Sequence, residues 1–202
     1  MFPLWTIALL VICYLLGSIP SGVLVARQSG VELSQHGSGN TGAANAYRAL
    51  GAKGGLIVLA MDLFKGSLAV LLAHLAIMPA FLMPAVKAVF GLVAILGHNY
   101  SVFRRFKGGK GIATTFGVVL ILAPRVAVLA FLLWIGMVAL TRYSSVGSLT
   151  AMASLPILMA LEGHSLFYIL FGFAAAALAF YKHKPNIERL RQGTELKLSQ
   201  KK

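Results

Sequence analysis

The sequence predicts an all-α integral membrane protein, a single bundle of seven transmembrane helices, some of them short, joined by polar glycine-rich loops on the cytoplasmic side. Of the 202 residues, 58% are hydrophobic and 11% are charged, whereas soluble domains carry about a quarter charged residues. Long apolar runs recur along the chain, and its basic residues cluster between or after them. We expect one membrane-embedded domain over residues 1–202, with a disordered tail beyond about residue 196.

Seven apolar stretches divide the chain into candidate spans. A bilayer core requires roughly 20 helical residues, so the first three stretches are long enough to cross and the later ones are shorter. The stretches run at about 3–25, 54–76, 80–100, 111–123, 126–141, 146–161 and 165–181.

The stretch from 111 to 141 can be interpreted in two ways, because Pro124 and Arg125 interrupt it. As one helix it gives six spans and places the basic C-terminal segment opposite the basic loop "RRFKGGK". As a hairpin turning at Pro124 it gives seven spans, with nearly all 18 Lys and Arg residues on one face. Proline does not continue a helix cleanly, and basic residues collect on the cytoplasmic side. We therefore predict seven spans in the cell (inner) membrane, with the N-terminus outside and the C-terminus in the cytoplasm.

This topology gathers four polar segments at the cytoplasmic face. They are residues 36–48, 97–114, 142–148 and 183–195. The formal net charge of +13 has two explanations, the positive-inside rule and an anionic substrate, and both can hold.

The first polar segment, "HGSGNTGAANAYR", has the composition of an anion-binding loop. Gly39 and Gly42 let the backbone approach a ligand closely, and Asn40, Thr41 and Asn45 add side-chain donors. Successive N–H groups at the start of a helix form an anion-binding concavity. The loop therefore predicts contact with a phosphate-type group.

The loop "FKGGKG" (106–111) repeats this composition with two lysines, also before a predicted helix. It is not a nucleotide P-loop, because Gly111 rather than Ser or Thr follows Lys110 and no strand precedes it. Two such loops predict two phosphate-type groups held without metal or other cofactor, since the chain has only five acidic residues. The alternative, that both loops are tight interfacial turns, stays open.

Five motifs, in order and spacing, resemble those of the PlsY family of bacterial acyl-phosphate:glycerol-3-phosphate acyltransferases. They are "GSGNTGAAN" followed by Arg48, "DLFKG" (62–66), "GHNYSVFRRFKGGKGIAT" (97–114), "RYSSVGS" (142–148) and "NIERLRQGTELK" (186–197). The chain departs from the family pattern at Ala44, where Thr is expected, and at Ser101, where Pro is common.

The resemblance implies transfer of a fatty acyl group from acyl-phosphate to glycerol 3-phosphate, giving lysophosphatidic acid and phosphate, the first acylation of phospholipid biosynthesis. Its expected partners are the two substrates and membrane lipids, with the soluble enzyme that makes acyl-phosphate as a further candidate and no nucleic acid. The residues implied for glycerol 3-phosphate are Arg48, Lys107, Ser145, His183 and Asn186. Those implied for acyl-phosphate are Ser38, Gly39, Asn40, Thr41, Gly42, Asn45, Gly108, Gly109, Lys110, Gly111 and Thr114.

The residues do not predict a protein nucleophile. No Ser-His-Asp arrangement is visible, and Cys13 lies in an apolar run, so a covalent acyl-enzyme is not expected. The family is thought to use the donor's own phosphate to take the hydroxyl proton. His98 is the candidate general base, with bracing of a neighbouring loop as its alternative role. Asp62 and Lys65, three apart on one helix, are expected to support the site.

Two other functions fit part of the sequence. A small-anion transporter would also be basic and glycine-rich, but such proteins usually show paired halves with broken helices, and no internal repeat is visible. An acyltransferase that uses an acyl-CoA thioester, with His98 as base, remains open. A metal-dependent phosphotransferase is excluded, because the chain contains a single aspartate and such a site needs several carboxylates.

Overall fold

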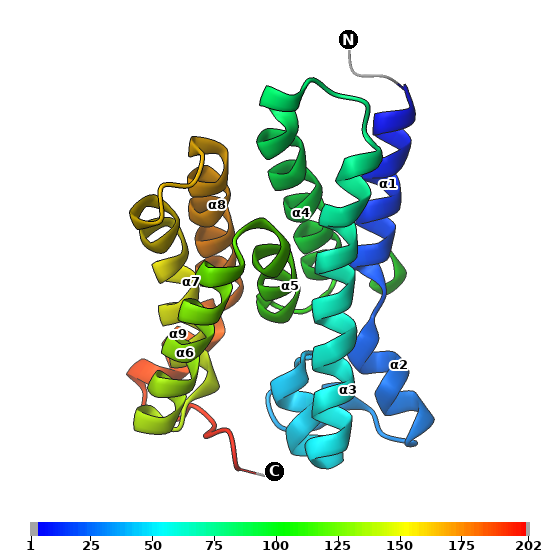
Figure 1. Cartoon of the computed structure of the whole chain (residues 1–202). Helices are drawn as coiled ribbons and strands as arrows, with labels where there is room; N and C mark the ends of the chain where they lie inside the picture. Colours follow the sequence, from blue (N-terminus) through cyan, green and yellow to red (C-terminus); the bar gives the residue numbers. More distant parts are fainter. Residues whose placement is uncertain (1–3, 201–202) are drawn as a thin grey trace.

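A computed structural model describes residues 4–200, which form helices and connecting loops without a strand (Figure 1). The α-helices are α1 Leu4–Ser18, α2 Ser21–Gln28, α3 Ala43–Leu72, α4 Met83–Asn99, α5 Ile112–Leu122, α6 Pro124–Thr141, α7 Ser144–Leu161, α8 Leu166–Lys182 and α9 Lys184–Arg191. Short 3-10 turns lie at Leu33–Gln35, Ala73–Leu75, Ala80–Leu82 and Val102–Arg104. Helices α1, α3 and α4 form one group and α6, α7 and α8 another, with α5 between them.

The all-helical membrane fold is confirmed, but the count of seven spans is not. Within the described residues, four helices are long and apolar enough to cross a membrane, and the count rises to six if the bent pairs α1–α2 and α8–α9 each form one span. A seventh span would require α5. Its 11 residues rise only about 17 Å, against the roughly 30 Å of a bilayer core.

The predicted break at Pro124 is present. Helix α5 ends at Leu122 and α6 begins at Pro124. Proline suits the first position of a helix, because the N–H that it lacks would have no hydrogen-bond partner within the helix there. Helix α5 packs closely on α3, because a Cβ at Gly66 would lie 2.1 Å from the Thr114 carbonyl oxygen and one at Gly117 2.0 Å from the Leu63 carbonyl oxygen. This backbone-to-backbone contact keeps the short helix in the middle of the molecule.

Helix α3 is kinked near its start. Gly51 has φ 76° and ψ −172° inside the helix, a left-handed conformation that glycine adopts without steric cost. The kink separates residues 43–50, which include Arg48, from the long apolar part of α3.

Up to residue 200, the segment after α9 contains no helix or strand and contacts two distant parts of the chain. The Leu198 N–H donates to the Arg142 carbonyl oxygen at 2.9 Å, and Arg48 donates to the carbonyl oxygens of Leu196 and Lys197. These contacts hold residues 194–200, here called the C-terminal strap, against α3 and the α6–α7 turn. Lys201 and Lys202 lie outside the described residues.

Candidate active site

A cavity of about 420 Å³ opens between α3, α5, α6, α7 and the C-terminal strap. The polar lining side chains come from loops and from residues near helix starts, and this part is here called the polar end; they include Ser38, Asn40, Arg48, Lys110, Ser145 and Asn186. The apolar lining side chains come from within α3, α5 and α6, and this part is here called the apolar arm; they include Leu59, Leu63, Phe116, Leu120, Phe131 and Trp134. The cavity can therefore accept a ligand with a charged head and a long apolar body.

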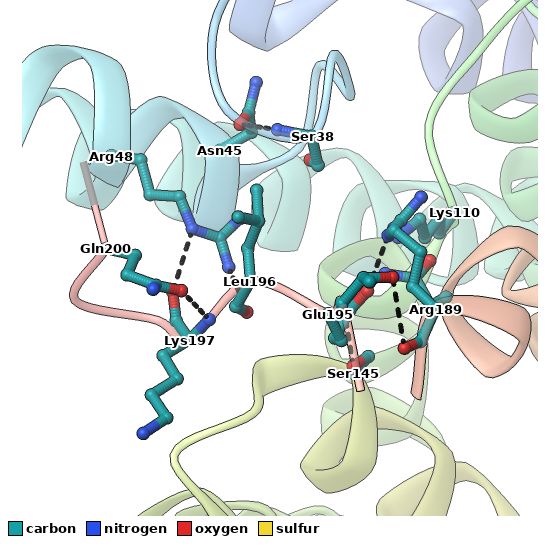
Figure 2. Close-up of polar contacts among 12 residues, drawn as sticks. Ser38, Asn45, Arg48, Lys110, Ser145, Arg189, Glu195, Leu196, Lys197 and Gln200 are labelled. Atoms are coloured by element: carbon teal, nitrogen blue, oxygen red, sulfur yellow. Dashed lines mark hydrogen bonds and ion pairs between the residues drawn. The ribbon is translucent and has the colours of Figure 1, made fainter. Parts of the chain in front are cut away.

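The first glycine-rich loop is held by two asparagines. Asn45 is buried; its side-chain oxygen accepts from the Ser38 N–H at 2.9 Å (Figure 2), and its amide donates to the carbonyls of Leu33 and His36. The Asn40 side chain accepts from the Gly42 N–H at 2.9 Å. Both side chains, predicted as ligand contacts, are thus engaged in shaping the loop.

The rest of that loop meets the cavity through its backbone. Gly42 is the N-cap of α3 and has no side-chain cap, so N–H groups at the start of α3 are available to an anion. Ala43 and Ala44 line the cavity beside Gly42, whereas Gly39 and Thr41 do not. Because Ala44 faces the cavity, this chain lacks a hydroxyl that threonine would place there.

Arg48 joins the loop to the C-terminal strap. Its Nε donates to the Lys197 carbonyl oxygen at 3.3 Å and one terminal nitrogen donates to the Leu196 carbonyl oxygen at 3.2 Å (Figure 2). A guanidinium has five N–H donors, so three remain after these two contacts. The strap fixes the side chain, and its remaining donors can serve a phosphate in the cavity.

A carboxylate, Glu195, lies at the centre of the predicted acceptor residues. Its Oε1 accepts from Ser145 Oγ at 2.9 Å and from Asn186 Nδ2 at 2.6 Å, and its Oε2 accepts from Arg189 Nε at 2.8 Å; Figure 2 shows this cluster. Burial acts to raise the pKa of Glu195, but hydrogen bonds from Asn186, Ser145 and Arg189, with the Arg189 charge, lower it overall. Glu195 is therefore an ionised acid in a basic site.

Lys110, rather than Lys107, joins this cluster. The Lys110 ammonium donates to the Asn186 side-chain oxygen, whereas Lys107 is exposed and does not line the cavity. Burial lowers the pKa of Lys110 to about 8, with Glu195 opposing and nearby cations adding to the shift. The sequence predicted Lys107 for the acceptor and Lys110 for the donor, and the structure places only Lys110 beside Asn186.

His183 is buried at the bend between α8 and α9 and lines the same cavity. Its Nδ1 lies 2.7 Å from the Ala179 carbonyl oxygen, which can only accept, so Nδ1 carries the proton. In the neutral ring, Nε2 is then free to accept a hydrogen bond from a ligand hydroxyl.

The second glycine-rich loop packs against His98. The Gly109 N–H donates to the His98 carbonyl oxygen at 3.1 Å, and a Cβ at Gly109 would lie 2.2 Å from His98 Nε2. Gly108 and Gly109 line a small second cavity, which His98 also lines, and not the main one; the buried Thr114 does not line the main cavity either. Of the five residues between 108 and 114 that were predicted for the acyl donor, Lys110 and Gly111 line the main cavity.

Asp62 and Lys65 form a buried pair beside His98. Lys65 Nζ lies 2.9 Å from Asp62 Oδ1 and donates to the Ile19 carbonyl oxygen at 3.1 Å. The same carboxylate oxygen lies 3.6 Å from His98 Nδ1, beyond direct hydrogen-bond distance. The pair connects the α1–α2 break with the helix that carries His98.

Sequence reasoning did not include Glu195 and Arg189 in the predicted site. The available signal was two acids, Glu188 and Glu195, within a basic C-terminal segment. Among residues 4–200, no cluster of three or more His, Cys, Asp or Glu side chains could hold a metal ion.

Comparison with known proteins shows which family this chain resembles. A family model described as "Glycerol-3-phosphate acyltransferase" matches residues 7–193. A glycerol-3-phosphate acyltransferase of Thermus thermophilus is 45% identical over 197 residues, covering 98% of this chain and 96% of the relative. Glycerol-3-phosphate acyltransferase 2 of Moorella thermoacetica is 45% identical over 199 residues, covering 98% and 100%.

Two solved structures have the same fold. Both are of PlsY (YgiH), an integral membrane glycerol 3-phosphate acyltransferase, and are 39% identical to this chain over 95% of its length and 94% of theirs. The TM-score is 0.89 for the glycerol 3-phosphate form and 0.87 for the lysophosphatidic acid form. These findings confirm the family that the sequence motifs predicted. The chain belongs to the glycerol-3-phosphate acyltransferase (PlsY) family and is an integral membrane acyltransferase.

Proposed function

We propose that this protein transfers a fatty acyl group from acyl-phosphate to glycerol 3-phosphate, forming lysophosphatidic acid and inorganic phosphate. One observation carries the proposal: a single cavity joins a cationic polar end to an apolar arm between α3, α5 and α6. The polar end fits two phosphate groups and the arm fits a fatty acyl chain. The two solved structures of PlsY (YgiH), described as its glycerol 3-phosphate form and its lysophosphatidic acid form, support the same substrate and product.

The acceptor phosphate is assigned to the end of the cavity that carries Arg48, Lys110 and Asn186. Arg48 retains three N–H donors after its strap contacts, and Lys110 supplies a compact ammonium. Ser145 and His183 lie at the same end and provide acceptors for the glycerol hydroxyls. We assign to Lys110 the contact that the family pattern suggested for Lys107, because Lys107 lies outside the cavity.

The donor phosphate is assigned to the helix starts that face the cavity. Helix α3 begins after Gly42 and α5 after Gly111, whose φ is 80°, and neither has a side-chain cap. Backbone N–H groups at such helix starts favour an anion without a metal. Lys110 lies between the two phosphate positions and can serve both.

The acyl chain is assigned to the apolar arm. The Phe131 ring lies edge-on to Phe116 and is stacked on Trp134, with ring centroids 6.0 Å apart in each pair. These rings form a wall that excludes water from the reacting carbonyl.

The reaction then requires positioning rather than a protein nucleophile. A glycerol hydroxyl oxygen forms a bond to the donor's carbonyl carbon, and the bond from that carbon to the phosphate oxygen breaks. Its electron pair leaves with the phosphate, which also takes the hydroxyl proton. The protein holds the two anions together and stabilises the developing charge with fixed donors.

A donor comparison tests the proposal. Purified protein should form lysophosphatidic acid and release phosphate from acyl-phosphate and glycerol 3-phosphate, and acyl-CoA should not replace the donor. Turnover with acyl-CoA alone would instead support the thioester-dependent alternative with His98 as base.

Metal removal should leave the activity unchanged. Because backbone N–H groups and cationic side chains face the phosphates, we expect full turnover in excess EDTA, measured by phosphate release. A chelator-sensitive rate restored by Mg²⁺ would contradict this assignment.

Replacing His98 should alter the rate without changing its pH dependence. If the donor's phosphate takes the proton, His98→Gln weakens turnover through the shape of the 106–111 loop alone. The profile of kcat against pH should then have the same shape as that of the wild type. A wild-type rate that falls at low pH through a titration absent in His98→Gln would identify His98 as the general base.

A further inference from the structure

The Asn186 side chain is occupied at both ends by protein groups. Its Nδ2 donates to Glu195 at 2.6 Å and its Oδ1 accepts from the Lys110 ammonium. The Asn186 amide lies between the Glu195 carboxylate and the Lys110 ammonium. A rotation of this amide by 180° would therefore break both hydrogen bonds. Asn186 therefore transmits the position of Glu195 to Lys110.

Glu195 also fixes the proton of Ser145. The Ser145 hydroxyl donates to Glu195 at 2.9 Å, so towards the cavity it presents only acceptor lone pairs. A ligand hydroxyl can donate to Ser145, whereas a phosphate oxygen gains nothing from it. Ser145 is thereby suited to the glycerol part of the acceptor rather than to its phosphate.

We propose that Glu195 is a positioning residue for the acceptor: its carboxylate sets the hydrogen-bond direction of Ser145 and Asn186 and, through Asn186, holds the Lys110 ammonium against the acceptor phosphate. This inference rests on the proposed function, because it takes glycerol 3-phosphate as the ligand of this end of the cavity. Arg189, 2.8 Å from the second carboxylate oxygen, keeps Glu195 in place.

The positioning role of Glu195 can be measured through the pKa of Lys110, which depends on the charges around it. Those that act on its pKa are Glu195, which raises it, and Arg189, Arg48 and Lys182, which lower it. His183, Asp62 and His98 line the same cavity. Neutralising Glu195 should lower the pKa of Lys110, and neutralising Arg189 should raise it.

The sign of the pH effect follows from the ligand. A phosphate monoester is a dianion above about pH 7, and it needs the protonated form of Lys110. The affinity for glycerol 3-phosphate should be constant below the pKa of Lys110 in the free protein, about 8. As the pH rises through that value, the affinity should fall by up to about tenfold per pH unit.

The experiment measures equilibrium binding of glycerol 3-phosphate by the full chain in detergent, by calorimetry, between pH 7 and 10. We expect the midpoint of Lys110 deprotonation in the free protein, which is the pH at which the affinity begins to fall, near pH 8 in the wild type and about one pH unit lower in Glu195→Gln. Glu195→Asp, which keeps the charge, should restore the wild-type midpoint. Glu188→Gln is the matched control, because Glu188 is exposed on α9, and its midpoint should equal that of the wild type.

A second variant covers the case in which Glu195→Gln does not fold. Arg189→Met should move the midpoint upward, opposite to the effect of Glu195→Gln. A role of Glu195 confined to holding the strap would weaken binding equally at every pH and leave both midpoints in place, and that result would overturn the inference while leaving the proposed function intact. A wild-type protein that does not bind glycerol 3-phosphate would overturn both.

Discussion

Replacing Arg48 with alanine should raise the KM for glycerol 3-phosphate at least tenfold while leaving the KM for the acyl donor within about twofold. A charge-assisted contact to phosphate contributes on the order of 1.5–3 kcal/mol, and 1.4 kcal/mol corresponds to about a factor of ten. If the contact is equally strong in the ground and transition states, kcat should change little. Steady-state kinetics with each substrate varied in turn would measure the effect.

A control variant and a second substitution of Arg48 show where the effect comes from. The control, Arg27→Ala, removes an exposed arginine from α2 and should leave both KM values unchanged. Arg48→Lys keeps the charge but loses the planar fork that reaches the carbonyls of Leu196 and Lys197, so its KM should lie between those of the wild type and Arg48→Ala. An increase confined to the donor KM would show that the two phosphate positions have been assigned the wrong way round.

The helical membrane fold could be predicted from composition because the bilayer leaves few alternatives. Apolar runs of sufficient length form helices there, and Pro124 marks the break between α5 and α6. The number of spans could not be predicted in the same way. Whether α5 crosses depends on its close packing against α3 at Gly66 and Gly117, which hydropathy does not show.

The two lysines of "FKGGKG" illustrate where site prediction from sequence ends. Both lie in a glycine-rich loop, and spacing alone does not indicate which one faces the ligand. In the structure Arg105 and Phe106 have φ values of 51° and 60°, the left-handed region that turns a chain sharply. Lys107 follows that turn and is exposed, whereas Lys110 lies beside Asn186. Neither of these two positions is a glycine, so the sequence does not predict a sharp turn there.

Long-range contacts account for the other differences. Asn45 lines the cavity, as a ligand contact would, but its hydrogen bonds to Leu33 and His36 depend on how the preceding loop folds back, which the sequence does not show. Glu195 reaches Arg189 across a turn at Gly193, whose φ is 69°. Its contact with Ser145, 50 residues away, could not be inferred from one sequence.

Replacing Gly109 with alanine should lower kcat/KM for the acyl donor by about ten- to hundredfold. The added Cβ would lie 2.2 Å from His98 Nε2 and 3.0 Å from His98 Cε1, and overpacking a buried contact costs about 1–3 kcal/mol. Gly109 is not among the glycines with positive φ, so alanine fits its backbone and the effect comes from His98 alone. Gly136→Ala, where a Cβ meets nothing within 4 Å, is the matched control and should retain wild-type activity.

The double variant Gly109→Ala/His98→Ala decides what His98 does. If His98 braces the loop, removing its ring makes room for the new methyl group, so Gly109→Ala should have almost no additional effect in the His98→Ala background. The two substitutions would then be strongly coupled in a double-mutant cycle, with phosphate release as the readout for all four proteins. If His98 is the general base, His98→Ala by itself removes most of the turnover, and the double variant is no more active than Gly109→Ala. Recovery of activity in the double variant can therefore come only from relief of the contact between the ring and the loop.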